Sequence, residues 1–175
     1  MEGAGLPDAA MAAFRHHLER FLNGDTGTLG REQIEPASTL ADIEYPGPTN
    51  LDRDLLARTV VVKLNVGLGT SMGLETAKSL IEVRPGTSFL DLIARQILAL
   101  RQRTDSSIPL LLMNSFRTEK DTTEALAAYP GLAADGLPLG FLQHRVPKIH
   151  TEDRLPVAWA AEPELEWCPP GHGDI

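Results

Sequence analysis

Residues 59–73 read TVVVKLNVGLGTSMG. The β-branched run at the start of this stretch is typical of a buried strand, and a glycine-rich loop, 65–73, follows it directly. Its three glycines let backbone amides approach an anion without a side chain in the way. The spacing Gly-x-Gly-x-x-x-Gly is one residue longer than the dinucleotide fingerprint, and Gly73 is followed by leucine where a phosphate-loop NTPase has lysine. On these residues alone, phosphate binding and a structural tight turn both stay open.

Strand-like and helix-like patterns alternate along the rest of the chain. Extended segments are expected at 59–64, 78–83, 108–113 and 139–143, and helices at 7–23, 88–103 and from Thr118 to the turn at 130–131. Ser88 and Asp91 predict a capped start of the second helix. This alternation predicts an α/β fold, a mostly parallel mixed sheet flanked by helices. Residues 24–58 read as an extended lead-in with one helical turn near 31–35, and the chain after 143 reads as irregular.

Three loops are candidates for ligand binding. In open α/β sheets, ligands bind outside the carboxyl ends of the strands. This rule selects the loops 65–73, 114–117 and 143–148. Lys78 follows the first loop closely enough to fold back over bound phosphates.

The composition excludes several classes of protein. The chain has 175 residues, 24 of them acidic and 16 basic, with a net charge of −8, 42% hydrophobic residues and one cysteine, Cys168. This apolar fraction is too high for a disordered chain, and a single cysteine excludes an intrachain disulfide. The acidic balance argues against a nucleic-acid-binding surface, and neither a membrane span nor a signal peptide is expected. We expect a soluble protein of a reducing compartment, the cytoplasm, and its oligomeric state stays open.

Several longer motifs occur in an order that resembles one family. They are KLNVGLGTSMG (63–73), KSLI (78–81), SFLDL (88–92), LMNSF (112–116), FLQ (141–143), RVPKI (145–149), LPV (155–157) and PPGHGDI (169–175). Together they closely resemble the UTP–glucose-1-phosphate uridylyltransferase family of the eukaryotic type, also called the UDP-glucose pyrophosphorylases. The match runs from about Val60 to the last residue.

The resemblance implies a fold, a reaction and a metal. Members of the family have a Rossmann-like nucleotidyltransferase domain followed by a C-terminal β-helix domain. The implied reaction takes UTP and glucose 1-phosphate, with Mg²⁺, to UDP-glucose and pyrophosphate. We expect 1–58 to form an N-terminal helix and lead-in, and 59–175 to form a truncated, N-terminal part of the nucleotide-binding domain, with the β-helix domain absent. A chain ending there is expected to turn over little or no substrate by itself.

The resemblance also implies roles for residues around the glycine loop. Leu64, Asn65, Val66 and Gly67 would lie along the nucleotide phosphates, and Val66 and Gly67 would also bind the sugar substrate. Lys78 would contact the phosphates near the metal, and it is the expected catalytic residue because its charge offsets that of the transition state. The family has glycine where this chain has Val66. Either this position has negative φ here, or the loop is altered and activity is weak.

Residues further along the chain would recognise the base and the sugar. The resemblance places Met113 beside the uracil, while Gln143 would hydrogen-bond its edge, for which a carboxamide offers both a donor and an acceptor. Gly171 would lie against the nucleotide, and His172 would contact the sugar phosphate. Asp174 is expected to have a structural hydrogen-bonding role in its glycine turn.

Metal ligands and two alternative functions complete the expectations. His144, His150, Cys168 and His172 fit no standard zinc spacing, and no metal ligand is predicted. One alternative function is a pyrophosphorylase for another sugar 1-phosphate, such as galactose 1-phosphate or N-acetylglucosamine 1-phosphate. The other is a catalytically inactive nucleotide-binding or oligomerisation module. The sugar pocket of the family lies mostly beyond Ile175, so the sequence does not decide between sugars. Val66 and the expected truncation are the arguments for the inactive module.

Overall fold

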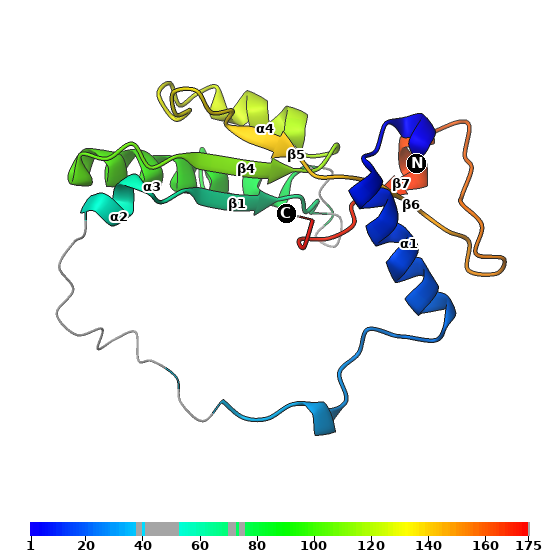
Figure 1. The fold of residues 1–175 in the computed structure, drawn as a ribbon. Coiled ribbons are helices and arrows are strands. Elements are labelled where there is room, and N and C mark those ends of the chain that lie inside the picture. The colour runs from blue at the N-terminus through cyan, green and yellow to red at the C-terminus, as the bar shows by residue number, and fades with distance from the viewer. Residues whose placement is uncertain (38–39, 41–52, 70–72, 74–75, 175) are drawn as a thin grey trace. The chain divides into compact units, whose positions relative to one another are not determined.

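The β-branched run forms β1 (Val61–Asn65), one of three parallel strands (Figure 1). β1 pairs with β4 (Leu110–Asn114), which pairs with β5 (Gly140–Leu142), so the sheet order is β1-β4-β5. The computed structural model describes residues 1–37, 40, 53–69, 73 and 76–174. The parallel strands confirm the α/β fold that the sequence predicts.

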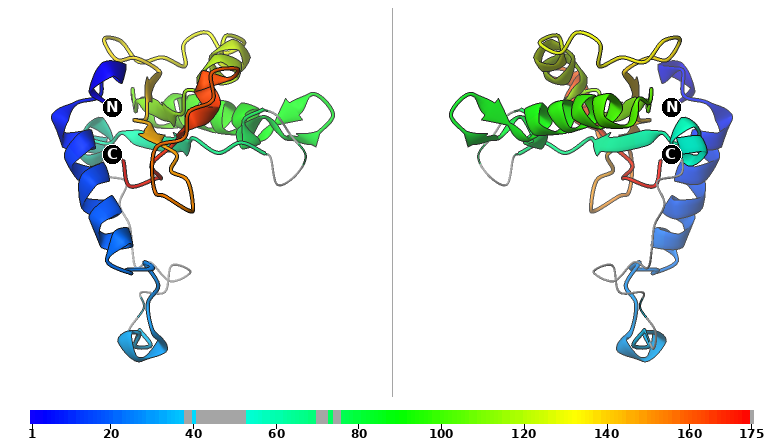
Figure 2. Two further views of the ribbon diagram at one scale, coloured as in Figure 1. Left: turned by 90° about the vertical axis from the view of Figure 1, so that its right-hand side faces the viewer. Right: turned by 90° about the vertical axis from the view of Figure 1, so that its left-hand side faces the viewer.

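Two helices pack on the sheet, α3 (Phe89–Thr104) and α4 (Glu119–Leu126), as Figures 1 and 2 show. The buried core is formed by apolar side chains of α3, β4, α4 and the loop after α4: Leu90, Ala94, Ile97, Leu110, Leu112, Leu126 and Leu132. Burying these side chains removes apolar surface from water, which is the main favourable term in folding. The core therefore fixes β4 against both helices and gives the carboxyl edge of the sheet a rigid base.

A capping box begins α3, as the sequence predicts. The Ser88 side chain accepts a hydrogen bond from the Asp91 amide, and the Asp91 carboxylate accepts from the Ser88 amide and hydroxyl. The Tyr129 hydroxyl also donates to this carboxylate, at 2.6 Å. The hydrogen bonds from the Ser88 hydroxyl, Tyr129 and the Ser88 amide lower the Asp91 pKa from 3.8 to about 2.

Acid should therefore destabilise the fold through Asp91. Because the folded-state pKa is depressed, the unfolded chain binds a proton first, so the stabilisation is present above 3.8 and is lost as pH falls toward about 2. Asp91→Asn should lower the free energy of unfolding by about 1 kcal/mol at neutral pH, the usual cost of a lost cap. It should also reduce the loss of stability in acid. Urea unfolding over this pH range measures both effects. If Asp91→Asn loses as much stability in acid as the parent chain does, the acid sensitivity comes from other carboxylates.

The expected extended segment at 78–83 is partly wrong. Lys78–Leu80 forms a 3₁₀ turn, η4, and only β2 (Glu82–Arg84) is extended, paired antiparallel with β3 (Thr87–Ser88). The turn forms because the Lys78 amide is bound by the Gly67 carbonyl, while Leu80 and Ile81 donate to the carbonyls three residues before them. Tertiary contacts of this kind override a short apolar run. A turn at 85–86, with Gly86 at φ 69°, connects β2 to β3.

Two further segments differ from expectation. α2 (Arg53–Ala57) is helical within the predicted lead-in. After β5, the chain is less irregular than predicted, because β6 (Val146–Pro147) pairs antiparallel with β7 (Trp167–Cys168), preceded by the 3₁₀ turn η5 (Pro163–Glu166). Strands of two residues carry too few positions for an alternating pattern to predict them.

The chain divides into two units, Met1–Leu51 and Asp52–Ile175. In the first unit, η1 (Glu2–Ala4) precedes the predicted helix, α1 (Asp8–Leu22), and the expected helical turn appears as η2 (Arg31–Gln33). Residues 38–39 and 41–52 of the lead-in lie outside the described residues.

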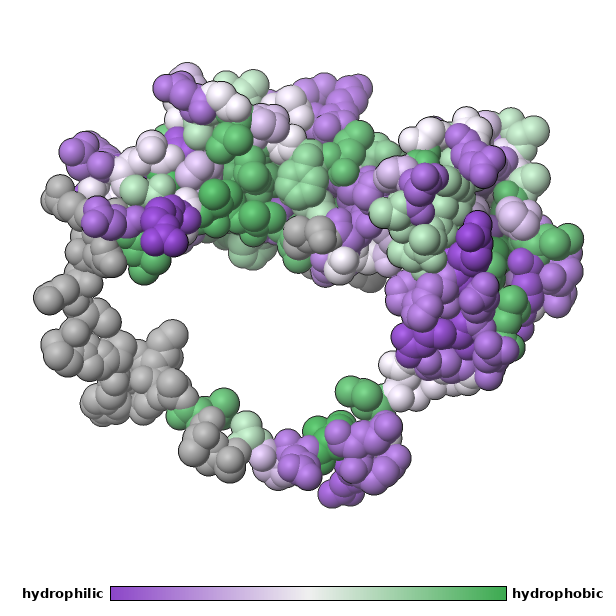
Figure 3. Space-filling model, viewed as in Figure 1, coloured by the Kyte–Doolittle hydropathy of each residue, from purple (hydrophilic) through white to green (hydrophobic). Residues whose placement is uncertain are grey.

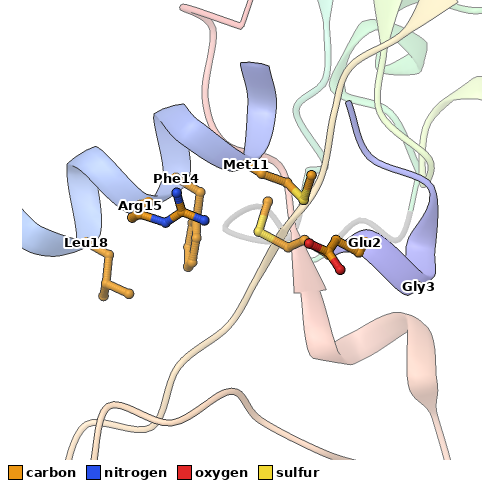
Figure 4. A pocket seen from close by; sticks show the side chains of 7 residues that line it. Glu2, Gly3, Met11, Phe14, Arg15 and Leu18 are labelled. Carbon is orange, nitrogen blue, oxygen red and sulfur yellow. The ribbon is translucent and has the colours of Figure 1, made fainter. Parts of the chain in front are cut away.

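An apolar stripe runs along α1. Met11, Phe14 and Leu18, at the spacing the sequence predicts, line a hollow of about 400 Å³ that η1 borders (Figure 4). No residue of α1 is buried within its own unit. The helix is thus amphipathic, with an apolar side that its own unit covers only in part.

The sheet has an incompletely covered side. Val60 and Val62 are 47% and 43% exposed. In Figure 3, hydrophobic residues gather over β1 and β4 on the side of the second unit that faces the viewer. Parallel sheets are normally covered on both faces, so this exposure is unusual for the architecture. Within the described ranges, no helix has the length and hydropathy needed to cross a membrane.

Candidate functional site

The three loops predicted to bind ligand meet at one edge of the sheet. Asn65 at the end of β1 lies in register with Asn114 at the end of β4, which lies in register with Leu142 at the end of β5. The Gln143 amide donates to the Asn114 carbonyl at 2.8 Å, which extends the pairing by one residue. The carboxyl ends of these parallel strands form the edge at which α/β folds bind ligands.

The glycine loop folds back on itself. Leu68 and Ala77 form an antiparallel bridge, and the Gly69 amide donates to the Thr76 carbonyl at 3.1 Å. Gly73 has φ 72°, a conformation that favours glycine, whereas Gly67 and Gly69 do not have positive φ. Residues 70–72 and 74–75 of the loop lie outside the described residues. The described part is a narrow antiparallel pair that starts at the end of β1.

Lys78 lies at the base of this loop, against Gly67. Its amide donates to the Gly67 carbonyl at 3.0 Å, and a Cβ placed on Gly67 would lie 3.7 Å from Lys78 Cδ. The lysine stem therefore runs over the glycine. Lys78 is exposed, and it takes part in none of the ion pairs found among the described residues. The structure brings together Gly67 and Lys78, two of the residues that the resemblance assigns to phosphate binding.

Val66 does not strain the loop. It is 8% exposed, and the described non-glycine residues with positive φ are Asp105 and Arg154. Of the two alternatives posed by the sequence, the structure has the first, a valine at negative φ. Val66 is buried, while Gly67 after it is exposed. Leu64 before it is half-buried.

A buried hydrogen-bond network lies under the loop, centred on Asn65, which is 4% exposed. Asn65 Nδ2 donates to Asn114 Oδ1 at 2.9 Å and to Thr122 Oγ1 at 2.8 Å, and Asn65 Oδ1 accepts from Ser79 Oγ at 2.6 Å. The Thr118 hydroxyl donates to the Asn65 carbonyl at 2.8 Å. The Asn65 side chain is thus bound by protein groups from η4, β4 and α4. It supports the loop from below.

Gln143 presents a buried acceptor that has no partner. The residue is 6% exposed, and its Nε2 donates to the Gly171 carbonyl. Its Oε1 is buried and has no hydrogen-bond partner among the described residues. An unsatisfied buried acceptor costs roughly 1–3 kcal/mol, so native proteins rarely keep one without a reason. A ligand N–H group at this position would satisfy it.

Met113 and the 171–174 turn lie on either side of this glutamine in sequence. Met113 is completely buried, so in this structure it lies below the surface and not at it. Gly171 has φ 121°. Three residues later, the Asp174 carboxylate accepts a hydrogen bond from the His144 amide at 2.7 Å and contacts His144 Nδ1 at 2.9 Å. These bonds hold the turn to the end of β5, which is the structural role that the sequence predicts for Asp174. His172 is exposed and lies between Gly171 and Asp174, both of which are hydrogen-bonded to the chain around β5.

Cys168 and Arg145 have contacts within the protein. Burial raises the pKa of the Cys168 thiol, which contacts the Val146 carbonyl, and a raised pKa disfavours the thiolate that a nucleophile needs. Arg145 stacks on Trp167, 4.7 Å from the ring centroid, and pairs with Glu164 at 3.5 Å. In the part of the chain that the structure describes, no group of three or more His, Cys, Asp or Glu side chains could hold a metal ion.

Sequence reasoning missed the members of the network other than Asn65. Asn114, Ser79, Thr118 and Thr122 are all buried and polar. The available signal was the position of polar residues directly after two apolar strands, because such residues end up at the carboxyl edge of the sheet. Ser79 gave no such signal, since its segment was predicted to be extended.

The chain has an α/β fold, and its candidate ligand-binding residues lie at the carboxyl edge of a parallel sheet. The family model for UTP–glucose-1-phosphate uridylyltransferase matches residues 11–175. The chain belongs to this family.

Named relatives and solved structures agree with this assignment. The chain is 38% identical to UTP–glucose-1-phosphate uridylyltransferase of Saccharomyces cerevisiae, covering 99% of this chain and 37% of that protein. A probable enzyme of the same name from Schizosaccharomyces pombe is 47% identical, over 96% of this chain and 33% of its own length. UDP-glucose pyrophosphorylase of Leishmania major, in a mutant form in complex with UDP-glucose, has a TM-score of 0.90 and 39% identity, over 99% of this chain and 36% of that chain. The chain therefore spans about a third of the length of these relatives.

Proposed function

We propose that this chain forms the nucleotide-binding part of a uridylyltransferase that makes UDP-glucose and pyrophosphate from UTP and glucose 1-phosphate. Its sheet would belong to a Rossmann-like domain made by 59–175, with 1–58 as an N-terminal extension. The observation that carries the proposal is the unpartnered Gln143 Oε1 at the edge where Lys78 lies over Gly67. The Gln143 acceptor suits the edge of a pyrimidine, and the Lys78 ammonium suits a phosphate chain.

Base recognition would follow from the free acceptor. The N3–H group of uracil can donate a hydrogen bond to Gln143 Oε1, whereas N3 of cytosine is an acceptor and cannot make this bond. Gly171 would lie against the nucleotide because the Gln143 carboxamide binds its carbonyl. Met113, buried beneath, would support the base without a polar contact.

The chemistry needs alignment and charge neutralisation. An oxygen of the sugar phosphate attacks the α-phosphorus of UTP in line, and pyrophosphate leaves, so no covalent enzyme nucleophile is required. The Lys78 ammonium would offset negative charge on the phosphates, and the amides around Gly67 would donate to them. His172, exposed on its anchored turn, would contact the sugar phosphate.

Magnesium is proposed to enter as part of the substrate. Phosphate-bound Mg²⁺ usually keeps several waters and takes only one or two carboxylates from the protein. The described residues offer no cluster that would bind the ion without the nucleotide, and Asp174 is already paired with His144. We therefore assign Mg²⁺ to the UTP phosphates and no residue of this chain to the metal.

Gln143→Ala tests base recognition. We expect UTP affinity to fall roughly tenfold, equivalent to ~1.4 kcal/mol, because one buried hydrogen bond is lost. Affinity for inorganic tripolyphosphate should stay within about twofold. Gln96→Ala, which removes an exposed glutamine side chain of α3, is the matched control. Isothermal titration of both ligands measures the effect, and equal losses for the two ligands would remove Gln143 from base recognition.

A further inference from the structure

Ser79 follows Lys78 in the chain but faces the opposite environment. Lys78 is exposed, whereas Ser79 is 7% exposed and its Oγ donates to Asn65 Oδ1 at 2.6 Å. We propose that Ser79 is a positioning residue, an inference that rests on the proposed function. Its buried hydrogen bond fixes the backbone from which the Lys78 ammonium reaches the nucleotide phosphates.

The backbone on both sides of Lys78 is held. Its amide donates to the Gly67 carbonyl at 3.0 Å, and its carbonyl accepts from the Ile81 amide at 3.2 Å. Ala77, the preceding residue, is completely buried and bridged to Leu68. Ser79 supplies the anchor on the following side. Only the flexible stem of the lysine is then left to be ordered when an anion binds.

The anchor is strong because of what lies behind it. Asn65 is itself bound to Asn114 on β4 and to Thr122 on α4, both of which are buried. Ser79 is the residue of η4 whose side chain joins this network in the described structure. A hydrogen bond into a satisfied buried network is firmer than one at the surface, because water does not compete for it. The position of Lys78 thus depends on contacts that reach across the sheet.

This arrangement lowers the cost of binding. An unanchored lysine must lose backbone and side-chain freedom when it binds a phosphate, and that loss is subtracted from the affinity. With η4 fixed in advance, only side-chain freedom is lost. Removing the Ser79 hydroxyl should therefore weaken phosphate binding through Lys78 and not through any contact of its own.

A double-mutant cycle separates positioning from a merely structural role. The affinities for UTP with magnesium and for inorganic tripolyphosphate are measured for the full chain, Ser79→Ala, Lys78→Ala and the double variant. We expect Ser79→Ala to lose about fivefold in affinity for both ligands when Lys78 is present, and less than twofold when it is absent. A role restricted to stability would reduce affinity equally in both backgrounds.

Further variants provide the controls. Ser79→Thr keeps the hydroxyl and should keep affinity within about twofold, while Ser79→Cys, with a weaker donor, should lie between serine and alanine. Thr104→Val removes a hydroxyl that is buried to the same 7% exposure at the far end of α3, and it should not couple to Lys78. If Ser79→Ala does not fold, Ser79→Cys takes its place in the cycle.

The outcomes test the positioning role of Ser79 separately from the phosphate contact of Lys78. If Lys78→Ala binds UTP as tightly as the parent chain, the proposed phosphate contact is wrong. If Lys78→Ala weakens binding but Ser79→Ala costs the same with and without Lys78, the contact stands and the positioning role is wrong. If Ser79→Ala weakens binding when Lys78 is present but not in the Lys78→Ala background, the phosphate contact and the positioning role are both supported.

Discussion

Replacing Lys78 with alanine is expected to weaken UTP binding by about 10- to 100-fold. A charge-assisted hydrogen bond contributes roughly 1.5–3 kcal/mol, and Lys78 is the exposed cation that lies directly over Gly67. Tripolyphosphate should lose affinity by the same factor, because the contact is with phosphate and not with the base. Isothermal titration with both ligands, at fixed magnesium, measures the loss.

Two controls sharpen the Lys78 experiment. Lys120→Ala removes another exposed lysine, in α4, and should change affinity by less than about twofold. Raising the ionic strength should weaken UTP binding more steeply in the parent chain than in Lys78→Ala, since screening acts on the charge that the variant lacks. Equal affinities and equal salt dependences in parent and variant would remove Lys78 from the site.

Asn65→Leu is expected to lower the free energy of unfolding by about 3 kcal/mol. The substitution leaves Ser79 Oγ and Asn114 Oδ1 without their buried partner and takes one donor from Thr122. Each unsatisfied buried polar group costs roughly 1–3 kcal/mol, and the apolar gain of leucine offsets only part of this. Urea unfolding, followed by circular dichroism, measures the change.

The control for Asn65 is a similar substitution on the surface. Gln102→Leu places the same apolar side chain on an exposed position of α3 and should change stability by less than about 0.5 kcal/mol. Asn65→Leu should also weaken tripolyphosphate binding, because Ser79 loses its anchor. If Asn65→Leu is as stable as the parent chain, the buried network does not support the loop as we describe.

The main strands and helices could be predicted from the sequence because their signals are local. A β-branched run became β1, and the Ser88–Asp91 pair became the capping box of α3. Thr118 begins α4 as predicted, but its side chain makes no cap; its hydroxyl bonds the Asn65 carbonyl instead. That choice depends on a strand 53 residues away, which no local pattern reveals.

The candidate site was predictable in outline and not in detail. The carboxyl-end rule placed Gly67 and Gln143 at one edge, with Lys78 expected to fold back over the first loop, and the structure has this arrangement. The sequence did not predict that Asn65 would have its side chain occupied by the protein, or that Gln143 would keep a free buried acceptor. Both features depend on which partners three separate segments bring into reach, and this is a property of the packing.

The central claim is that Gly67, Lys78 and Gln143 together bind UTP, and amide chemical-shift mapping tests it most directly. UTP with magnesium is titrated into the ¹⁵N-labelled chain. We predict saturable shifts of the Gly67 and Lys78 backbone amides and of the Gln143 side-chain amide, all with one dissociation constant. Saturable shifts confined to other parts of the chain, with these three signals unmoved, would contradict the account.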